Sequence, residues 1–352
     1  MTIDRLVSLD GLRGLAIILV VCFHAYAMYP DLIPWTTIYR DFFIFKFGWL
    51  GVELFFLISG FVIYLTLQKC KTLKEFIYRR WIRLFPTMLI GSVIIYISAI
   101  YLPERPNGMP NFVDLFPGLL FIHPEVLKTL FDIEVKSLEN VFWSLFVEVK
   151  FYLMFGSLYF YNKSTVLRNS IILFLMPFFC HLVTKIAVIN VTIPSSILTL
   201  FYNTLSLQYF GWFIIGALLY QLYSTDDKRI NLIALLLLAA TIDLTVGIQM
   251  DFIIACLCVY MIFYLAIFNK KLMGIFKSNF FVFFGYISYP LYLIHESIMI
   301  ALTVKTHRSF PSIPDLITPI PGIVMIISLC LLIIKFIEPM IRKLLRSTFE
   351  RN

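Results

Sequence analysis

The sequence predicts an all-α fold: a polytopic membrane protein built as a bundle of about ten transmembrane helices. Of the 352 residues, 60% are hydrophobic and only 14% are charged, whereas a soluble domain carries roughly a quarter charged residues. Apolar runs of about 20 residues recur along the whole chain, and each is long enough to cross a bilayer as a helix. Because such spans must pack together, we expect residues 1–352 to form a single transmembrane domain.

The apolar runs define the expected spans in order along the chain. Their approximate bounds are 9–28, 42–67, 81–102, 141–161, 170–190, 198–223, 230–248, 250–268, 280–304 and 322–341. The run at 112–122 is too short to cross a bilayer, so we expect a re-entrant or interfacial segment there. It lies in the longest expected loop, 103–140.

The basic residues predict the orientation of the bundle. With the N-terminus in the cytoplasm, nineteen Lys and Arg residues fall on the inner side and six on the outer side. Cytoplasmic loops are rich in Lys and Arg, and an even number of spans puts both ends on one side. We therefore expect both termini to be cytoplasmic.

Charge and cysteine usage exclude other classes. The net charge of +8 fits basic cytoplasmic loops and contact with membrane lipids, and no nucleic-acid partner is expected. None of the six cysteines forms a CxxC pair and five lie in apolar spans, which is typical of small core residues. We expect no disulfide framework and no metal site.

The first span carries two ionisable residues, Arg13 and His24, in an apolar setting. They are eleven residues apart, which on a helix is about 20° past three full turns and a rise of about 16 Å. Both therefore share one face, and Asp10 lies one turn before Arg13. An ionisable residue within a span predicts a functional site. The structural alternatives are a snorkelling anchor for Arg13 and a helix-bridging hydrogen bond for His24.

Carboxylates occur in two further spans. Glu53 lies in the second span, and Ser144, Glu148 and Tyr152 recur at i, i+4 and i+8 in the fourth, so that they lie along one helix face. Each glutamate is a candidate for acid–base chemistry. The structural alternative is a buried carboxyl that is protonated or hydrogen-bonded.

The ninth span adds Tyr292 and His295. Judged by depth, His24, Glu53, Glu148 and His295 all fall in the outer half of the bundle, where we expect them to meet. A carboxylate beside a histidine raises its basicity and selects its tautomer, which would make an acid–base site. For His295 the alternative is again a structural hydrogen bond.

A basic cluster faces the cytoplasm in the stretch KCKTLKEFIYRRWIRLFP, residues 69–86. Arg80 and Arg83 are three residues apart and project together at the start of the third span. Guanidinium groups bind phosphates in a bidentate manner. The alternatives are a charge that only sets topology, or contact with anionic lipids.

These motifs resemble those of the acyltransferase-3 family of membrane acyltransferases, and the resemblance covers nearly the whole chain. Five blocks occur in order: Arg13 with His24 in LDGLRGLAIILVVCFH, GVELFFLISGF at 51–61, Arg80 with Arg83 in RRWIRLFP, WSLFVEVKFY, and SYPLYLIH ending at His295. The resemblance implies transfer of an acyl group, commonly acetyl, from cytoplasmic acyl-CoA to a glycan or another acceptor at the outer face.

The resemblance also implies roles. His24 would be the catalytic histidine, with Arg13, Arg80 and Arg83 associated with CoA. Asp10, Glu53, Ser144, Tyr152, Tyr292 and His295 are expected to line the site. We expect a bacterial cytoplasmic (inner) membrane protein that acts on a cell-surface polysaccharide such as lipopolysaccharide O-antigen, free or lipid-linked. Peptidoglycan, a periplasmic glucan or a small molecule remain alternatives, and the oligomeric state is open. Some relatives carry an extracytoplasmic esterase-like domain, which we do not expect here.

Two mechanisms fit this assignment. CoA's pantetheine arm is comparable in length to the rise from Arg13 to His24, so the thioester could reach His24 while the nucleotide stays inside. His24 could act as general base on an acceptor hydroxyl, oriented by Glu148. Alternatively, His24 itself becomes acylated and relays the group.

Two rival functions come from other classes. Buried carboxylates and a Pro-broken helix also suit a proton-coupled secondary transporter of a small metabolite or lipid-linked glycan. A secondary transporter would be expected to contain internal repeats, and none is evident in this sequence. A non-catalytic assembly subunit is the other rival. The glycerol-phosphate acyltransferase pattern is absent, because no His has an Asp five positions later.

Overall fold

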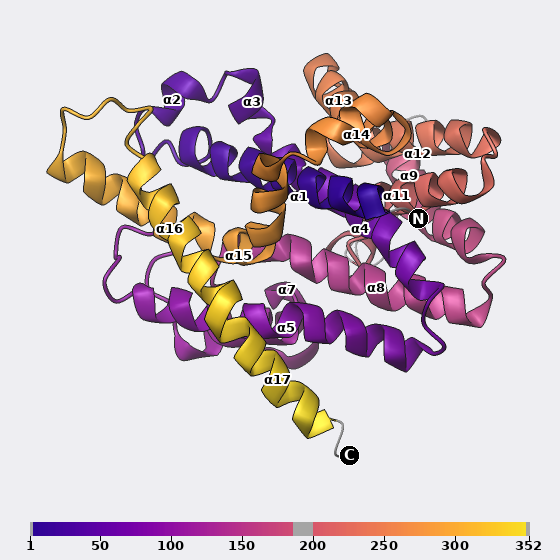
Figure 1. Ribbon diagram of the computed structural model, residues 1–352, viewed down its shortest axis with the longest axis horizontal. Coiled ribbons are helices and arrows are strands. Elements are labelled where there is room, and N and C mark those ends of the chain that lie inside the picture. Colours follow the sequence, from indigo (N-terminus) through magenta and orange to yellow (C-terminus); the bar gives the residue numbers. More distant parts are fainter. Residues whose placement is uncertain (1–2, 186–199, 350–352) are drawn as a thin grey trace. The chain divides into compact units, whose positions relative to one another are not determined.

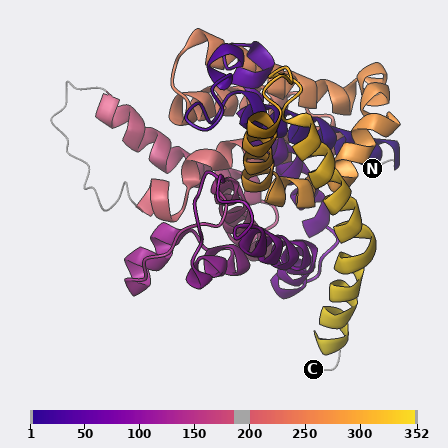
Figure 2. The ribbon, with the colours of Figure 1, turned by 90° about the vertical axis from the view of Figure 1, so that its left-hand side faces the viewer.

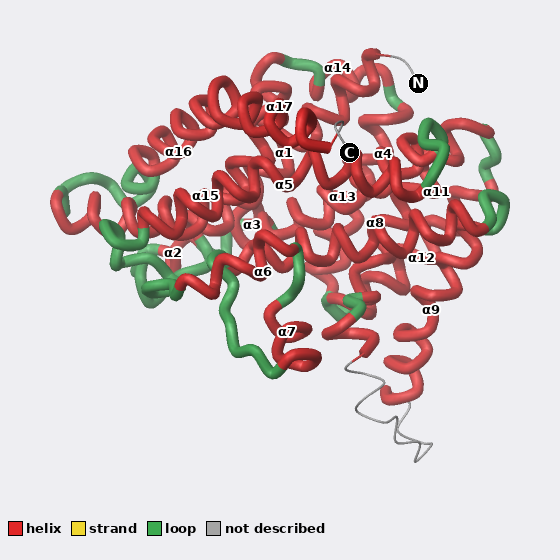
Figure 3. The backbone as a smooth tube through the Cα atoms, turned by 90° about the horizontal axis from the view of Figure 1, so that it is seen from below, coloured by secondary structure: helices red, strands yellow, loops and turns green. Residues whose placement is uncertain are grey.

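The computed structural model describes residues 3–185 and 200–349, and within those ranges it consists of helices and loops without a strand (Figure 3). Eight helical segments there are long and apolar enough to cross a membrane. They are Leu6–Tyr26, Gly48–Leu67, Leu73–Ser98, Asn140–Tyr161, Val166–Val183, Met250–Phe268, Asn279–Ser309 and Ile320–Leu345. The prediction of an all-α polytopic membrane protein is confirmed.

Two other expected spans correspond to shorter helices. Helix α11 (Phe210–Thr225) has 16 residues and α12 (Arg229–Thr245) has 17, against about 20 for a typical bilayer core. The expected spans 170–190 and 198–223 also reach into residues 186–199, which lie outside the described residues. The count of ten spans and the cytoplasmic termini stay predictions.

The chain forms two compact units. Unit 1 comprises Met1–Val52, Arg80–Trp143 and Gly274–Asn352, and unit 2 comprises Glu53–Arg79 and Ser144–Met273. The long helices of unit 1 are α1 (Ile3–Tyr26), most of α5 (Leu73–Ser98), α15 (Asn279–Ser309), α16 (Ile320–Leu332) and α17 (Glu338–Phe349). Those of unit 2 are most of α4 (Gly51–Leu67), α8 (Trp143–Tyr161), α9 (Val166–Lys185), α11, α12 and α13 (Met250–Phe268) (Figure 1).

Short helices fill the connections. They are α2 (Thr36–Tyr39), α3 (Phe43–Lys46), η1 (Gly48–Leu50), η2 (Phe112–Asp114), α6 (Leu115–Leu120), α7 (Pro124–Phe131), η3 (Asn140–Phe142), η4 (Leu200–Thr204), η5 (Leu207–Tyr209), α14 (Lys270–Phe276) and η6 (Ile333–Ile337). The predicted short segment at 112–122 is thus η2 and α6. Helix α16, the π-helical η6 and α17 follow one another as a long rod towards the C-terminus (Figure 2).

Helix α5 begins about two turns before the expected third span. Thr72 accepts a hydrogen bond on its Oγ1 from the Glu75 backbone N–H at 3.2 Å, and the Glu75 carboxylate accepts from the Lys71 N–H at 2.8 Å. These two contacts satisfy N–H groups that a helix start leaves without partners. As a result Arg80 and Arg83 lie inside a helix rather than at its start.

Helices α1 and α15 pack at backbone distance in unit 1. A Cβ atom added at Gly14 would lie 2.0 Å from the Phe281 carbonyl oxygen, and one at Gly285 would lie 1.9 Å from the Asp10 carbonyl oxygen. Only glycine permits this approach, which is typical of small-residue contacts between membrane helices. Helix α1 carries His24 and α15 carries His295, so this contact helps to set the positions of the two histidines relative to each other.

Unit 2 has an aromatic core. Phe213 of α11 stacks between Phe56 of α4 and Phe151 of α8, with ring centroids 4.4 Å apart in each pair. Gly60 of α4 lies against the Phe213 backbone, where a Cβ would come within 1.9 Å of the carbonyl oxygen. Offset aromatic stacking of this kind adds to the burial of the rings themselves.

We expect Gly14→Ala to destabilise the protein by about 1–3 kcal/mol, because the added methyl group would clash with backbone atoms of α15. Unlike a flexible side chain, these atoms cannot move aside without shifting the helix. Thermal unfolding of the purified protein in detergent measures this. Gly274→Ala is the matched control, since a Cβ there has no atom within 4 Å. Equal melting temperatures for the two variants would contradict the α1–α15 contact.

Candidate active site

Two histidines meet in the interior of unit 1. His24 of α1 and His295 of α15 are both buried, and His24 Nδ1 lies 3.3 Å from His295 Nε2. Their ring planes are nearly perpendicular, at 80°. Of the four side chains expected to meet, these two are in contact.

The backbone selects the tautomer of each ring. His295 Nδ1 lies 2.9 Å from the Tyr292 carbonyl oxygen, and His24 Nδ1 lies 2.8 Å from the Val20 carbonyl oxygen. Because a carbonyl only accepts, each Nδ1 must carry the proton. Neutral His295 then presents the lone pair of Nε2 to His24, and neutral His24 keeps a lone pair on its own Nε2. His24 therefore has one nitrogen available as a base or nucleophile.

A buried carboxylate, Glu296, follows His295 in α15. It accepts hydrogen bonds from the Tyr29 hydroxyl, from Asn140 Nδ2 at 3.0 Å and from the Val141 N–H at 3.1 Å. The Tyr29 ring centroid is 6.2 Å from that of His24. Burial and the neighbouring Glu296 carboxylate raise the pKa of Tyr29, so its hydroxyl keeps its proton and donates.

A second buried carboxylate, Glu139, lies beside this one. It accepts from Ser297 Oγ at 2.7 Å and from the Ser297 N–H at 3.2 Å, and the Arg105 guanidinium is 3.7 Å from its other oxygen. Burial and the Glu296 charge raise the pKa of Glu139, while Arg105 acts in the opposite direction. Arg105 also donates to the carbonyl oxygens of Ile95 and Leu138. These groups cross-link α5, α15 and the segment before α8.

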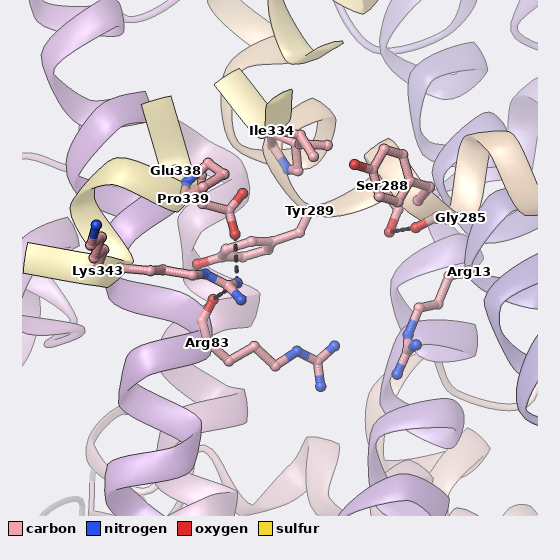
Figure 4. A pocket seen from close by; sticks show the side chains of 12 residues that line it. Arg13, Arg83, Gly285, Ser288, Tyr289, Ile334, Glu338, Pro339 and Lys343 are labelled. Atoms are coloured by element: carbon pink, nitrogen blue, oxygen red, sulfur yellow. Dashed lines mark hydrogen bonds and ion pairs between the residues drawn. The ribbon is translucent and has the colours of Figure 1, made fainter. Parts of the chain in front are cut away.

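Near the middle of α1, Arg13 borders a cleft of about 870 Å³ in unit 1, here called the cationic cleft. It is lined by Arg13, Arg83, Gly285, Tyr286, Ser288, Tyr289, Pro290, Ile334, Glu338, Pro339, Arg342 and Lys343. Figure 4 shows the Arg13 and Arg83 side chains extending into it from different helices. Four cations and one carboxylate make the cleft suitable for a polyanion.

Contacts at the walls hold the cleft together. Arg342 pairs with Glu338 at 2.5 Å and donates to the Arg83 carbonyl oxygen at 3.4 Å, and the Tyr289 hydroxyl donates to the Leu84 carbonyl oxygen at 2.9 Å. Arg13 pairs with Asp10 at 2.5 Å. Of the two arginines predicted from the RxxR spacing, Arg83 lines the cleft. Arg80 is buried one turn earlier and is not among the lining residues.

The remaining predicted residues divide between the units. In unit 1, the Tyr292 hydroxyl donates to the Val141 carbonyl oxygen at 3.0 Å. In unit 2, Glu148 accepts from the hydroxyls of Ser59 and Tyr152. Glu53 and Ser144 are buried, also in unit 2. That Glu53 and Glu148 join the two histidines stays a prediction.

Sequence reasoning missed several polar residues that surround Glu296, the neighbour of His295 in the chain. Tyr29, Arg105 and Glu139 lie in loops, where no helical period relates them to the histidines. Their hydrogen-bond and ion-pair partners depend on how these loops fold against α15. One signal was available: Glu296 directly follows His295, and a carboxylate within an apolar span requires donors.

The profile of the acyltransferase domain family matches residues 6–335 of this chain. Over 157 residues the chain is 29% identical to the peptidoglycan O-acetyltransferase OatA of Listeria monocytogenes, an alignment that covers 42% of this chain and 20% of that protein. The O-acetyltransferase OatA of Staphylococcus aureus is 29% identical over 161 residues, which is 42% of this chain and 24% of the relative. The chain thus spans about a quarter or less of these two relatives.

A third relative is similar over most of its length. The protein named "Putative acetyltransferase ORF330", from the Acidianus two-tailed virus, is 26% identical over 300 residues, 81% of this chain and 80% of that protein. No solved structure matches this chain.

We expect Arg105→Met to destabilise the protein by about 3–5 kcal/mol, because it leaves Glu139 buried near Glu296 without its cation. Arg105→Met combined with Glu139→Gln should recover part of the loss, a coupling that a double-mutant cycle measures by thermal unfolding. The exposed pair of Arg308 with Glu104 is the control, and Arg308→Met should change little. Strictly additive effects of the Arg105 and Glu139 changes would show that the two charges do not interact.

Proposed function

Because this chain belongs to the acyltransferase-3 family, we propose that it is a membrane O-acetyltransferase acting on a hydroxyl group of a cell-surface glycan. We further propose acetyl-CoA as the donor and the bacterial inner membrane as the location. The observation that carries the proposal is helix α1, which bears a histidine with one available nitrogen in its last turn and, eleven residues earlier, an arginine that lines the cationic cleft.

The cationic cleft supports a nucleotide donor. CoA carries a pyrophosphate and a phosphate monoester, and guanidinium groups bind phosphate oxygens in pairs of hydrogen bonds. Arg13 and Arg83 supply such groups, and the rings of Tyr286 and Tyr289 add aromatic surface suited to an adenine. From Arg13, α1 rises about 16 Å to His24, a distance that suits the pantetheine arm.

His24 supports the chemical step in either of two ways. As general base, its Nε2 takes the proton of the acceptor hydroxyl while the acceptor oxygen attacks the acetyl carbon; the C–S bond breaks and the CoA sulfur receives that proton. As nucleophile, Nε2 attacks the thioester and the CoA thiolate leaves; the acceptor hydroxyl then gives its proton to a second base while its oxygen takes the acetyl group and the bond to Nε2 breaks. In both cases His295 Nε2 would share the Nδ1–H of His24 with the Val20 carbonyl oxygen and help to stabilise positive charge on the ring.

We propose a cell-surface glycan as the acceptor. Lipopolysaccharide O-antigen is the acceptor predicted from the sequence, and the name of the Listeria relative specifies peptidoglycan. Glu148, with its Ser59 and Tyr152 donors, is a candidate to orient a hydroxyl. Mass spectrometry of glycan fractions from cells with and without the gene would identify the acetylated fraction.

His24→Ala should reduce acetyl transfer from acetyl-CoA by at least about 100-fold, because it removes the only proposed base or nucleophile. Release of CoA by purified protein in nanodiscs with an added glycan fraction measures this. His123→Asn is the control histidine change, since His123 caps α7 and Asn is a favoured capping residue. Full transfer by the His24→Ala protein would refute the assignment. Transport of the glycan without CoA release would favour the transporter.

His295→Phe should lower kcat roughly 10-fold to 100-fold and leave the KM for acetyl-CoA unchanged, because His295 contacts His24 and not the cationic cleft. His295→Gln should restore part of kcat, since its side-chain oxygen can accept from the Nδ1–H of His24. A rise in KM with constant kcat would instead assign His295 to donor binding.

Labelled acetyl-CoA distinguishes the two routes. An acetyl group trapped on His24 in the absence of acceptor, found by mass spectrometry of the quenched protein, is expected only for the nucleophile route. Turnover that strictly needs both substrates, with no trapped species, is expected for the general-base route.

A further inference from the structure

Two cationic side chains that line the cationic cleft, Arg83 and Lys343, are not paired with an acidic side chain among the described residues. In the part of the chain that the structure describes, neither side chain makes an ion pair or a hydrogen bond, whereas Arg13 pairs with Asp10 and Arg342 with Glu338. The two come from different helices, Arg83 from α5 and Lys343 from α17. A cleft with two such cations can take a further anionic group.

Arg342 connects these helices. Its guanidinium donates to the Arg83 carbonyl oxygen at 3.4 Å and pairs with Glu338 one turn earlier in α17. This contact docks α17 on α5 at Arg83, and Lys343 is the next residue along α17. The hydrogen bond from Arg342 to the Arg83 carbonyl oxygen thus holds α17 and α5 together so that the side chains of Arg83 and Lys343 line the same cleft.

The order of the cations along the cleft suggests which phosphate each would meet. Figure 4 shows Arg13 on one side, Lys343 on the other, and the Arg83 side chain between them. Arg13 belongs to the helix that leads to His24, so the part of the donor nearest its thioester should lie on that side. In CoA the pyrophosphate is on the arm, while the 3′-phosphate is at the far end, on the ribose.

We propose that Lys343, together with Arg83, binds the 3′-phosphate of the CoA donor, and that Arg342 is the positioning residue that docks α17 for this purpose. The inference rests on the proposed function. A phosphate monoester carries nearly two negative charges at neutral pH and favours paired cations. Helix α17 would therefore let the enzyme discriminate CoA from donors that lack this phosphate.

Acetyl-3′-dephospho-CoA is the probe that tests the subsite. In the wild-type protein the KM for this analogue should exceed that for acetyl-CoA by about 10-fold or more. Lys343→Gln should raise the KM for acetyl-CoA about 10-fold and leave that for the analogue unchanged, so that discrimination is lost. Lys343→Arg should retain it, and Lys270→Gln, an exposed lysine on α14 outside the cleft, should have no effect.

Arg342→Gln tests the positioning contact. It should weaken discrimination with little change in kcat, because it loosens α17 rather than removing a group near the acetyl. If Lys343→Gln retains the wild-type preference for acetyl-CoA over the analogue, the proposal is wrong. If its activity instead depends on anionic phospholipid, with discrimination intact, Lys343 binds a lipid phosphate and the proposal is likewise wrong.

The outcome separates this inference from the function on which it rests. A wild-type protein that turns over acetyl-CoA while Lys343→Gln leaves discrimination unchanged refutes the α17 subsite alone. A wild-type protein that turns over neither donor refutes the proposed acetyl transfer itself.

Discussion

Helices α1 and α15 touch at their backbones, and the rest of unit 1 is arranged around that contact. Gly14 and Gly285 remove the side chains that would otherwise separate the two helices. The same pair of helices then supplies His24, His295 and Glu296, together with several residues of the cationic cleft. A membrane bundle gains little from burying apolar surface against lipid, so its helices associate through close packing and interhelical hydrogen bonds.

Polar groups in unit 1 are held mostly by backbone atoms. The two histidines each contact a carbonyl oxygen of the preceding turn, Arg105 donates to two carbonyl oxygens, and Glu296 accepts from the Val141 N–H. Backbone partners cannot change rotamer, and they are available in any sequence. Such contacts let a largely apolar chain keep several ionisable groups in defined orientations.

The sequence was sufficient for the class of fold and for the face shared by Arg13 and His24. The fold class follows from composition and from the length of the apolar runs, and the shared face follows from the helical period. Tyr29, Arg105 and Glu139 were not predicted, because their positions depend on how loops fold over α15 and no period links them to it. The start of α5 was set too late, since Thr72 and Glu75 begin the helix before its apolar run. From the sequence, Lys343 is only one of the inner basic residues that predict orientation. The contact between Arg342 and Arg83, which brings Lys343 to the cleft, joins residues 259 positions apart, and no sequence spacing predicts it.

The protonation pattern of the histidine pair limits the order of chemical events. Since both Nδ1 atoms face carbonyl oxygens, His24 offers a single nitrogen to the reaction. An acetyl group and a proton cannot occupy that atom at once. While the ring is acetylated, it has no site left to receive the hydrogen of an incoming alcohol, so a covalent route requires another base close to the acceptor. A single-step transfer has no such requirement, and the two routes therefore differ in how many titratable groups the protein must bring to one hydroxyl.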